Sequence, residues 1–476
     1  MTATQRRITV AVCVIVGLSL LMAAGLTFLV APMSESLELP DAAVEDLLAI
    51  PSVAALIAVF SAGQLGDRLG PRRTLVASGL TFSLGAGILT AAPGGLLAEL
   101  GIAICAAAAI TMQIVGVSLL QRATVDGPAQ VSAFTTYGAI FPAAFLVLPV
   151  ATAGLLGLVT WRIVPLIWVV AGLVITAVAR TLLAPDEAEP DHLGRTTRGP
   201  EWWTPLLAGV SLAGFGRAFA EVGQFDQDPR AVGTGLIIGA AAGGICLLIL
   251  RSSSHPGLSL APIRPAVLRV LLAGVGLVAF VGLLTFLSIT LEYFYDMTPF
   301  DASLAMIPAQ IGAVVGAKIL ATQAMRRWTG LQAGRYLMLG IALMVLGLLA
   351  VTANTPAWYL VLVASGCSLA GMGALTVLNT EVMRRAPRQS TGAVSSFRTA
   401  SSSLGGALGV GIFGTLIIST VQVDSGEASV TTAQLDQLAA SVRLVGVGAS
   451  VVAALGWLML TLAERRSTAN QQAVAT

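Results

Sequence analysis

The chain has 476 residues, of which 56% are hydrophobic and 11% are charged, with a mean hydropathy of +0.87. A soluble globular domain carries about 25% charged residues, so this chain has too little charge to cover a water-facing surface of its size. Its 51 glycines suit close helix–helix contact in a bilayer. The net charge of +2 indicates no nucleic-acid partner. The composition therefore predicts a polytopic membrane protein.

Fourteen apolar runs reach the ~20 residues that a membrane-spanning helix needs. The runs are continuous rather than alternating, which favours helices over a β-barrel. We therefore predict an all-α polytopic helical bundle with 14 transmembrane helices. The predicted spans cover residues 8–31, 46–62, 74–92, 96–120, 131–156, 161–183, 203–222, 231–250, 266–290, 302–322, 336–353, 357–380, 391–420 and 437–463.

Two polar breaks, at 184–202 and 251–257, separate two blocks of six spans from a central pair. Repeated halves around a midplane cavity are typical of secondary transporters. The predicted domains are an N-terminal six-helix half (1–183), a linker with two inserted helices (184–257), a C-terminal six-helix half (258–463) and a cytoplasmic tail (464–476).

Charge alternates between the loops. Segments 31–46 and 291–301 contain acidic residues and no basic one, whereas 323–335 contains three arginines and no acid. Basic loops face the cytoplasm under the positive-inside rule. The alternation predicts a multi-pass protein of the cell membrane with both termini in the cytoplasm, although Arg162 and Arg230 fall on the outer side.

The loop at residues 63–73 reads GQLGDRLGPRR. Its glycines allow a tight turn between two helix ends, and its arginines anchor the loop and can pair with carboxylates. The order of these residues resembles the G-x-L-A-D-R-x-G-R-R signature of the major facilitator superfamily, between spans two and three as in that family. The matching positions, which we predict to form a cytoplasmic gate, are Gly63, Leu65, Asp67, Arg68, Gly70, Arg72 and Arg73.

The resemblance implies transport by alternating access, with the loop closing a charged contact between the halves through Asp67 and Arg68. Fourteen spans, with Trp161–Arg162 and the segment 392–410, further resemble the drug:proton antiporter branch of the superfamily. That branch implies export of hydrophobic or cationic small molecules in exchange for protons, which is multidrug efflux.

Three departures from the branch concern proton coupling. Span 8–31 has no acidic residue, span 96–120 has no arginine, and neither proline of span 131–156 follows a glycine. These departures leave two alternatives open. One is an exporter of an endogenous metabolite or lipid-like compound without classical proton coupling, and the other is a membrane sensor or scaffold that transports nothing.

Ionisable groups at membrane depth are costly and are functional candidates by default. For Lys318, snorkelling to the membrane surface is favoured, and Glu381 is expected at the interface. Arg217 and Glu221 have the spacing of a helical pair. The predicted substrate or coupling residues are Gln113, Arg217, Glu221, Glu292, Tyr295 and Arg398.

Several kinds of site are not expected. The four cysteines lie in apolar runs without metal-ligand spacing, and no constellation of catalytic residues lies at depth, so we expect no metal, cofactor or enzyme. Residues 409–414 spell G-x-G-x-x-G inside a span, where helix packing is favoured. The chain has one lysine, Lys318, and its neighbours Ala317 and Ile319 do not fit the phosphate-binding loop pattern. No ATP site is therefore expected. The expected partners are a small-molecule substrate, protons and the lipid bilayer.

Overall fold

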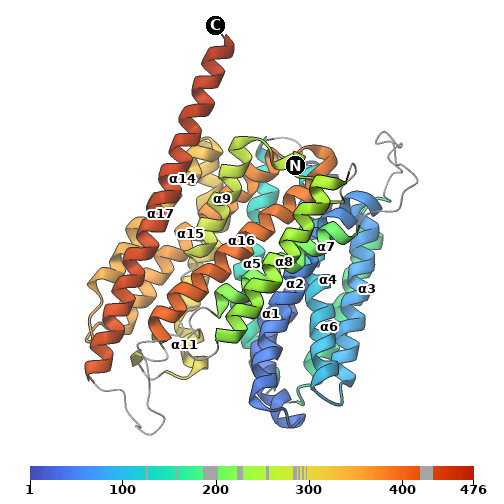
Figure 1. Ribbon diagram of the computed structural model, residues 1–476, viewed down its shortest axis with the longest axis vertical. Helices are drawn as coiled ribbons and strands as arrows, with labels where there is room; N and C mark the ends of the chain where they lie inside the picture. Colours follow the sequence, from blue (N-terminus) through green and yellow to red (C-terminus); the bar gives the residue numbers. More distant parts are fainter. Residues whose placement is uncertain are drawn as a thin grey trace.

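The computed structural model describes residues 1–124, 127–156, 159–185, 202–221, 229–253, 257–281, 287, 290–291, 294–295, 297–418 and 432–475. All regular structure within these residues is helical. The long helices lie side by side, and both chain termini lie at the same end of the bundle (Figure 1). The all-α fold class is therefore confirmed for the described part of the chain.

The helices follow one another with short connections in the first half and longer ones later. The first six are α1 (Ala3–Ser36), α2 (Asp41–Leu69), α3 (Pro71–Ala91), α4 (Gly95–Ala123), α5 (Gly127–Leu156) and α6 (Ile163–Leu182). The rest are α7 (Trp203–Ala220), α8 (Pro229–Ser252), η2 (Ala261–Ile263), α9 (Ala266–Phe280), α11 (Pro299–Ala305), α12 (Ile307–Val315), η3 (Gly316–Leu320), α13 (Ala321–Arg327), α14 (Gly330–Val345), η4 (Leu346–Ala350), α15 (Ala357–Arg384), η5 (Arg388–Ser390), α16 (Thr391–Ile418) and α17 (Thr432–Ala475).

Eleven helices of the described chain are long and apolar enough to cross a membrane. The predicted spans 203–222, 266–290 and 391–420 correspond to α7, α9 and α16, which are not among those eleven. The count of fourteen therefore stays a prediction. The predicted span 302–322 is divided into α11, α12, η3 and α13, and Pro308, which has no backbone N–H to donate, stands in the first turn of α12, just after the break.

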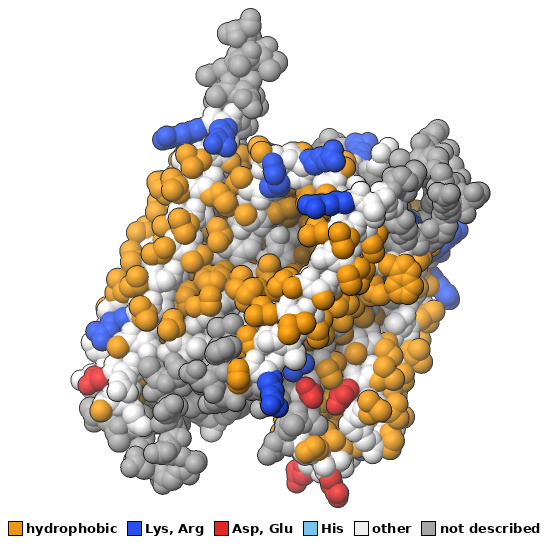
Figure 2. All heavy atoms as spheres, viewed as in Figure 1, with side chains coloured by type: hydrophobic (Ala, Val, Ile, Leu, Met, Phe, Trp, Pro, Cys, Tyr) orange, Lys and Arg blue, Asp and Glu red, His pale blue; other side chains and the backbone are white. Residues whose placement is uncertain are grey.

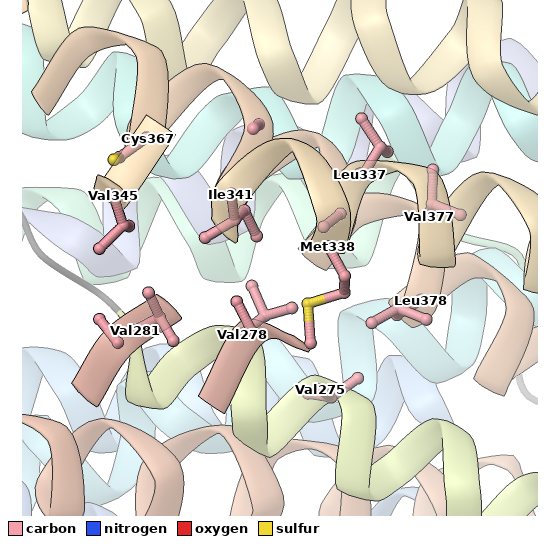
Figure 3. Packing of buried hydrophobic residues seen from close by; sticks show 14 of the residues in the cluster. Val275, Val278, Val281, Leu337, Met338, Ile341, Val345, Cys367, Val377 and Leu378 are labelled. Atoms are coloured by element: carbon pink, nitrogen blue, oxygen red, sulfur yellow. The ribbon is translucent and has the colours of Figure 1, made fainter. Parts of the chain in front are cut away.

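Two large apolar clusters hold the bundle together. One is built mainly by α1, α3, α4 and α6 around the fully buried Phe82 and Trp168. The other is built mainly by α9 and α12 to α17, and it also includes side chains of α1, α4 and α5. In this second cluster, Met338 of α14 lies between Val275 of α9 and Leu378 of α15 (Figure 3). The first cluster therefore stays within the predicted N-terminal half, whereas the second extends across to it.

The inserted pair α7 and α8 is packed through small residues. Gly214 of α7 lies against Gly239 of α8, and Gly209 of α7 lies against the backbone of α2. Gly411 of α16 lies against the backbone at the end of α7. Gly409 and Gly411 of the segment 409–414 thus contact neighbouring helices, and α7 contacts both the first and the second half.

Charge is unevenly distributed between the two ends of the bundle. Figure 2 shows most of the visible Lys and Arg side chains at the end that carries both termini, and the visible Asp and Glu side chains at the opposite end. We call these the basic end and the acidic end. Because α2, α4, α13 and α15 all finish at the basic end with an arginine in the last turn, this end gathers cations from both halves.

Candidate functional site

The turn between α2 and α3 places Asp67 at the basic end. Gly70 has a backbone φ of 89°, which residues other than glycine rarely adopt. Pro71 follows at the first position of α3, where its missing N–H costs no helical hydrogen bond. The turn therefore follows directly from the sequence, and it leaves Asp67 in the last turn of α2.

Asp67 binds the start of α16, a helix of the second half. The Gly392 and Ala393 backbone N–H groups donate to its two carboxylate oxygens, each over 3.0 Å. The first N–H groups of a helix have no partner within the helix, and they carry partial positive charge. A carboxylate at this place therefore satisfies two of them and stabilises the contact between the halves.

Arg122, in the last turn of α4, completes the contact. Its Nη2 lies 2.6 Å from the Asp67 Oδ1, and its Nε donates to the Thr391 hydroxyl over 3.0 Å. The Ser118 hydroxyl of α4 lies 2.6 Å from the same Thr391 hydroxyl. The predicted span 96–120 stopped just before Arg122, whereas α4 continues to Ala123, so the sequence reasoning missed this partner.

Glycine and serine allow the helices to approach closely beside Asp67. A Cβ atom on Gly63 would lie 2.4 Å from the Gly392 carbonyl oxygen, which leaves room only for glycine. Further along α16, the Ser395 hydroxyl donates to the Ile114 carbonyl and the Ser396 hydroxyl to that of Val59. These contacts close the basic end between α2, α4 and α16. We call Gly63, Asp67, Arg122, Thr391 and Gly392 the gate.

Arg398 lies about 10 Å further along α16 from the gate, at 1.5 Å per residue. It is only 7% exposed. Its Nη2 donates to the Thr399 hydroxyl over 3.1 Å, and its Nε has no hydrogen-bond partner in the described chain. Tyr137 of α5 lies beside the guanidinium and donates to the Gln113 carbonyl oxygen over 3.4 Å. Tyr137, which the sequence reasoning missed, thus connects Arg398 with the main chain of α4 at Gln113.

Lys318 provides a second embedded cation. It lies in η3, a π-helical turn of the kind that is frequent at functional sites. Its Nζ donates to the Thr136 hydroxyl and to the Ser132 carbonyl oxygen of α5. Lys318 is half-buried, and its ammonium group bonds a helix of the other half, so snorkelling to the membrane surface stays a prediction.

Comparison with known proteins identifies the family. Residues 12–410 match the family model of the Major Facilitator Superfamily. The chain belongs to the major facilitator superfamily. It is 22% identical over 428 residues to the multidrug efflux pump LfrA of Mycolicibacterium smegmatis, covering 86% of this chain and 79% of that protein. This protein is accordingly a membrane transporter of the superfamily and not an enzyme.

Two solved structures share the fold of this transporter. The crystal structure of the human organic anion transporter MFSD10 (TETRAN) matches with a TM-score of 0.64 at 15% identity, over 97% of this chain and 100% of that one. A bacterial homologue of the iron transporter ferroportin, in an outward-facing state with soaked iron, matches with a TM-score of 0.55 at 12% identity, over 96% and 99%. At these identities the likeness concerns the fold alone.

The remaining residues of the 63–73 loop contact α3, the end of α6 and the residue before α7. The Leu65 carbonyl accepts a hydrogen bond from Thr74 over 3.1 Å. The Arg68 guanidinium lies 5.6 Å from the ring centre of Trp202, just before α7, and Arg72 donates to the backbone at the end of α6. Arg73 is exposed. Asp67 therefore contacts the second half, while Arg68 contacts the start of the inserted pair.

Glu381 corrects another expectation. It is fully buried at the end of α15, not interfacial. Its carboxylate lies 2.8 Å from Arg384 and 2.8 Å from Arg385, and a Cβ on Gly330 would lie 2.3 Å from its Oε2. The loop between α13 and α14 contains no acidic residue that could correspond to Asp67. The buried carboxylate of the second half is instead Glu381, at the end of α15. Two arginines and a neighbouring glycine explain its burial.

The other predicted candidates lie towards the acidic end. Arg217 and Glu221 form the ion pair that their spacing predicts, with 2.8 Å between Nε and Oε1, and Arg217 is 46% exposed. The Tyr295 hydroxyl donates to the Thr355 carbonyl, and burial raises the pKa of Tyr295 to about 12, which keeps it a neutral donor. Glu292 lies outside the described residues.

Proposed function

We propose that this transporter exports hydrophobic or cationic small molecules across the plasma membrane in exchange for protons. The observation that carries the proposal is the gate. Asp67 joins α2 to Arg122 and to the start of α16 by a small number of polar bonds. Alternating access requires contacts between the halves that form in one state and break in the other. The named activity of the relative LfrA supports efflux as the direction.

We further propose that the basic end faces the cytoplasm, following the positive-inside rule. Arg68, Arg122, Arg326 and Arg384 all lie at this end. An epitope tag placed before Met1 is expected to be labelled by antibody in permeabilised cells and to stay unlabelled in intact cells. Labelling of intact cells would place the gate on the outer side and contradict the orientation.

A second candidate function is export of an anionic or lipid-like compound without a proton-carrying carboxylate. Arg398 and Lys318 favour it, because each is embedded and neither has a carboxylate partner within the described chain. Partly desolvated cations attract an anionic ligand and repel a cationic one. The two candidate functions therefore differ in the charge of the transported molecule.

One flux experiment separates the two candidates. The purified full-length protein is reconstituted in liposomes, and uptake of ethidium, a lipophilic cation, and of anilinonaphthalene sulfonate, a lipophilic anion, is measured with and without an imposed pH gradient. The first candidate predicts gradient-driven movement of ethidium. The second predicts movement of the anion without the gradient, and an Arg398→Gln variant about tenfold slower, the effect of losing ~1.4 kcal/mol. Movement of neither probe would contradict both and favour a scaffold.

A further inference from the structure

A cavity of about 560 Å³ lies at the basic end between the two halves. The start of α5, the end of α13, the start of α14 and the end of α15 surround it. Its size falls within the range of about 300 to 1,000 Å³ that is usual for small-molecule sites. The cavity is separate from the gate, whose residues come from α2, α4 and α16.

The described walls of the cavity carry three cations and no acidic side chain. These are Lys318, Arg326 and Arg384. Arg384 pairs with Glu381 at 2.8 Å, a carboxylate that it shares with Arg385. Lys318 donates only to neutral oxygens of α5, and Arg326 has no ion pair within the described residues. Among the described residues that line the cavity, Lys318 and Arg326 are therefore the two cations without a carboxylate partner.

Polar and aromatic groups accompany the charge. Ser132 and Thr322 line the cavity near Lys318, where the Thr322 hydroxyl donates to the Lys318 carbonyl oxygen. Trp328 also lines it and lies next to Tyr336, with ring centres 4.9 Å apart. Lys318 lies nine residues before Arg327, the end of α13, which corresponds to about 13 Å along the helix. The cavity thus runs from the level of an interfacial tryptophan into the bundle, and its cations line that path.

We propose that this cavity binds the anionic headgroup, a phosphate or a carboxylate, of an amphiphile. Lys318 and Arg326 pair with the anion, and the Ser132 hydroxyl donates to one of its remaining oxygens. The amphiphile is either an acidic phospholipid or a lipophilic anion that the protein carries. Only the second source rests on the second candidate function, export of an anionic compound, since binding itself needs no transport.

Fluorescence quenching of Trp328 tests the site. Purified full-length protein in neutral detergent is titrated with brominated phosphatidylglycerol, brominated phosphatidylcholine and bromododecanoate, and quenching is compared with that of a Trp328→Phe variant. Saturable quenching that depends on Trp328 is expected with phosphatidylglycerol or bromododecanoate, and not with phosphatidylcholine. Quenching by phosphatidylglycerol alone indicates a lipid site, and quenching by bromododecanoate alone indicates a substrate site. Equal quenching by the neutral lipid overturns the proposal.

Charge variants show which cations act. Lys318→Gln and Arg326→Gln are each expected to weaken binding at least about tenfold, because each removes one of the two cations without a carboxylate partner. Arg327→Gln is the matched control, since Arg327 ends the same helix and does not line the cavity. Lys318→Arg retains the charge and is expected to retain binding, which separates charge loss from misfolding. Equal affinity in Arg326→Gln and Arg327→Gln overturns the proposal.

Binding and transport are measured on the same preparations, so their failures can be told apart. Quenching without flux of any probe would support the anion site and contradict the export function. Flux of a lipophilic anion without Trp328-dependent quenching would support export and contradict this binding site. Binding at the site is also expected to weaken with added salt, because exposed charges such as Arg326 are screened.

Discussion

An Asp67→Asn variant is expected to insert in the membrane and to transport at least about tenfold more slowly than the native protein. The amide retains one acceptor oxygen and presents a donor NH₂ where the second carboxylate oxygen faces N–H groups. Hydrogen bonds to a charged group contribute about 1.5–3 kcal/mol each, and ~1.4 kcal/mol corresponds to tenfold in a population. The loss therefore shifts the protein away from the state in which the basic end is closed.

Closure can be measured separately from transport. The Ser118 and Thr391 hydroxyl oxygens lie 2.6 Å apart across the gate, so cysteines at these two positions are expected to form a disulfide when the basic end is closed. The four native cysteines are buried and free and are replaced by alanine for this test. Asp67→Asn is expected to slow cross-linking by at least about tenfold, the same factor that transport loses.

A matched control comes from the second half. Glu464 pairs with Arg335 at 2.7 Å, and its side chain is 18% exposed against 15% for Asp67. This pair joins α14 to α17 within one half. Glu464→Gln therefore removes a similar ion pair without touching the gate, and it is expected to retain cross-linking and transport. If Asp67→Asn behaved like Glu464→Gln, the carboxylate would have no part in closure.

A Gly63→Ala variant is expected to open the gate by steric conflict. The added methyl carbon would lie 2.4 Å from the Gly392 carbonyl oxygen and 2.3 Å from the Ser396 hydroxyl oxygen. Because both are far below van der Waals contact, α16 has to move away from α2, at a cost of about 1–3 kcal/mol. The expected result is a cross-linking rate and a transport rate lower by about tenfold or more.

The control for this variant lies on α16 itself. Gly406 has nothing within 4 Å of its added Cβ, so Gly406→Ala places the same methyl group on the same helix without a conflict. It is expected to behave like the native protein in both measurements. Fast cross-linking in Gly63→Ala would mean that α2 and α16 do not need their close approach.

Much of the fold could be predicted from the sequence, because helices, turns and the loop motif each depend on residues that are close together in the chain. Apolar runs predict helices, since lipid leaves backbone groups no other partner than their own helix. The turn before α3 follows from Gly70 and Pro71, whereas the break before α12 was not predicted, since 302–322 was expected to form one span. The superfamily could be predicted because the 63–73 loop is a contiguous pattern.

The partners of the candidate residues could not be predicted in this way. Asp67 binds N–H groups 325 and 326 residues further along the chain. Arg122 carries no pattern of its own, and it fell just outside the expected span. Glu381 was expected at the interface, because charge near a helix end is usually solvated, whereas two arginines and the helix packing bury it.

The sequence by itself determined the class, the helical segments and the loop that carries the gate. Those properties follow from local hydrophobicity and from backbone geometry, which each segment retains wherever it packs. Only the tertiary structure decided that Asp67 meets Arg122 and α16, and that Lys318 reaches α5. Such contacts depend on how whole helices are placed beside one another, and that placement results from the summed packing of many side chains.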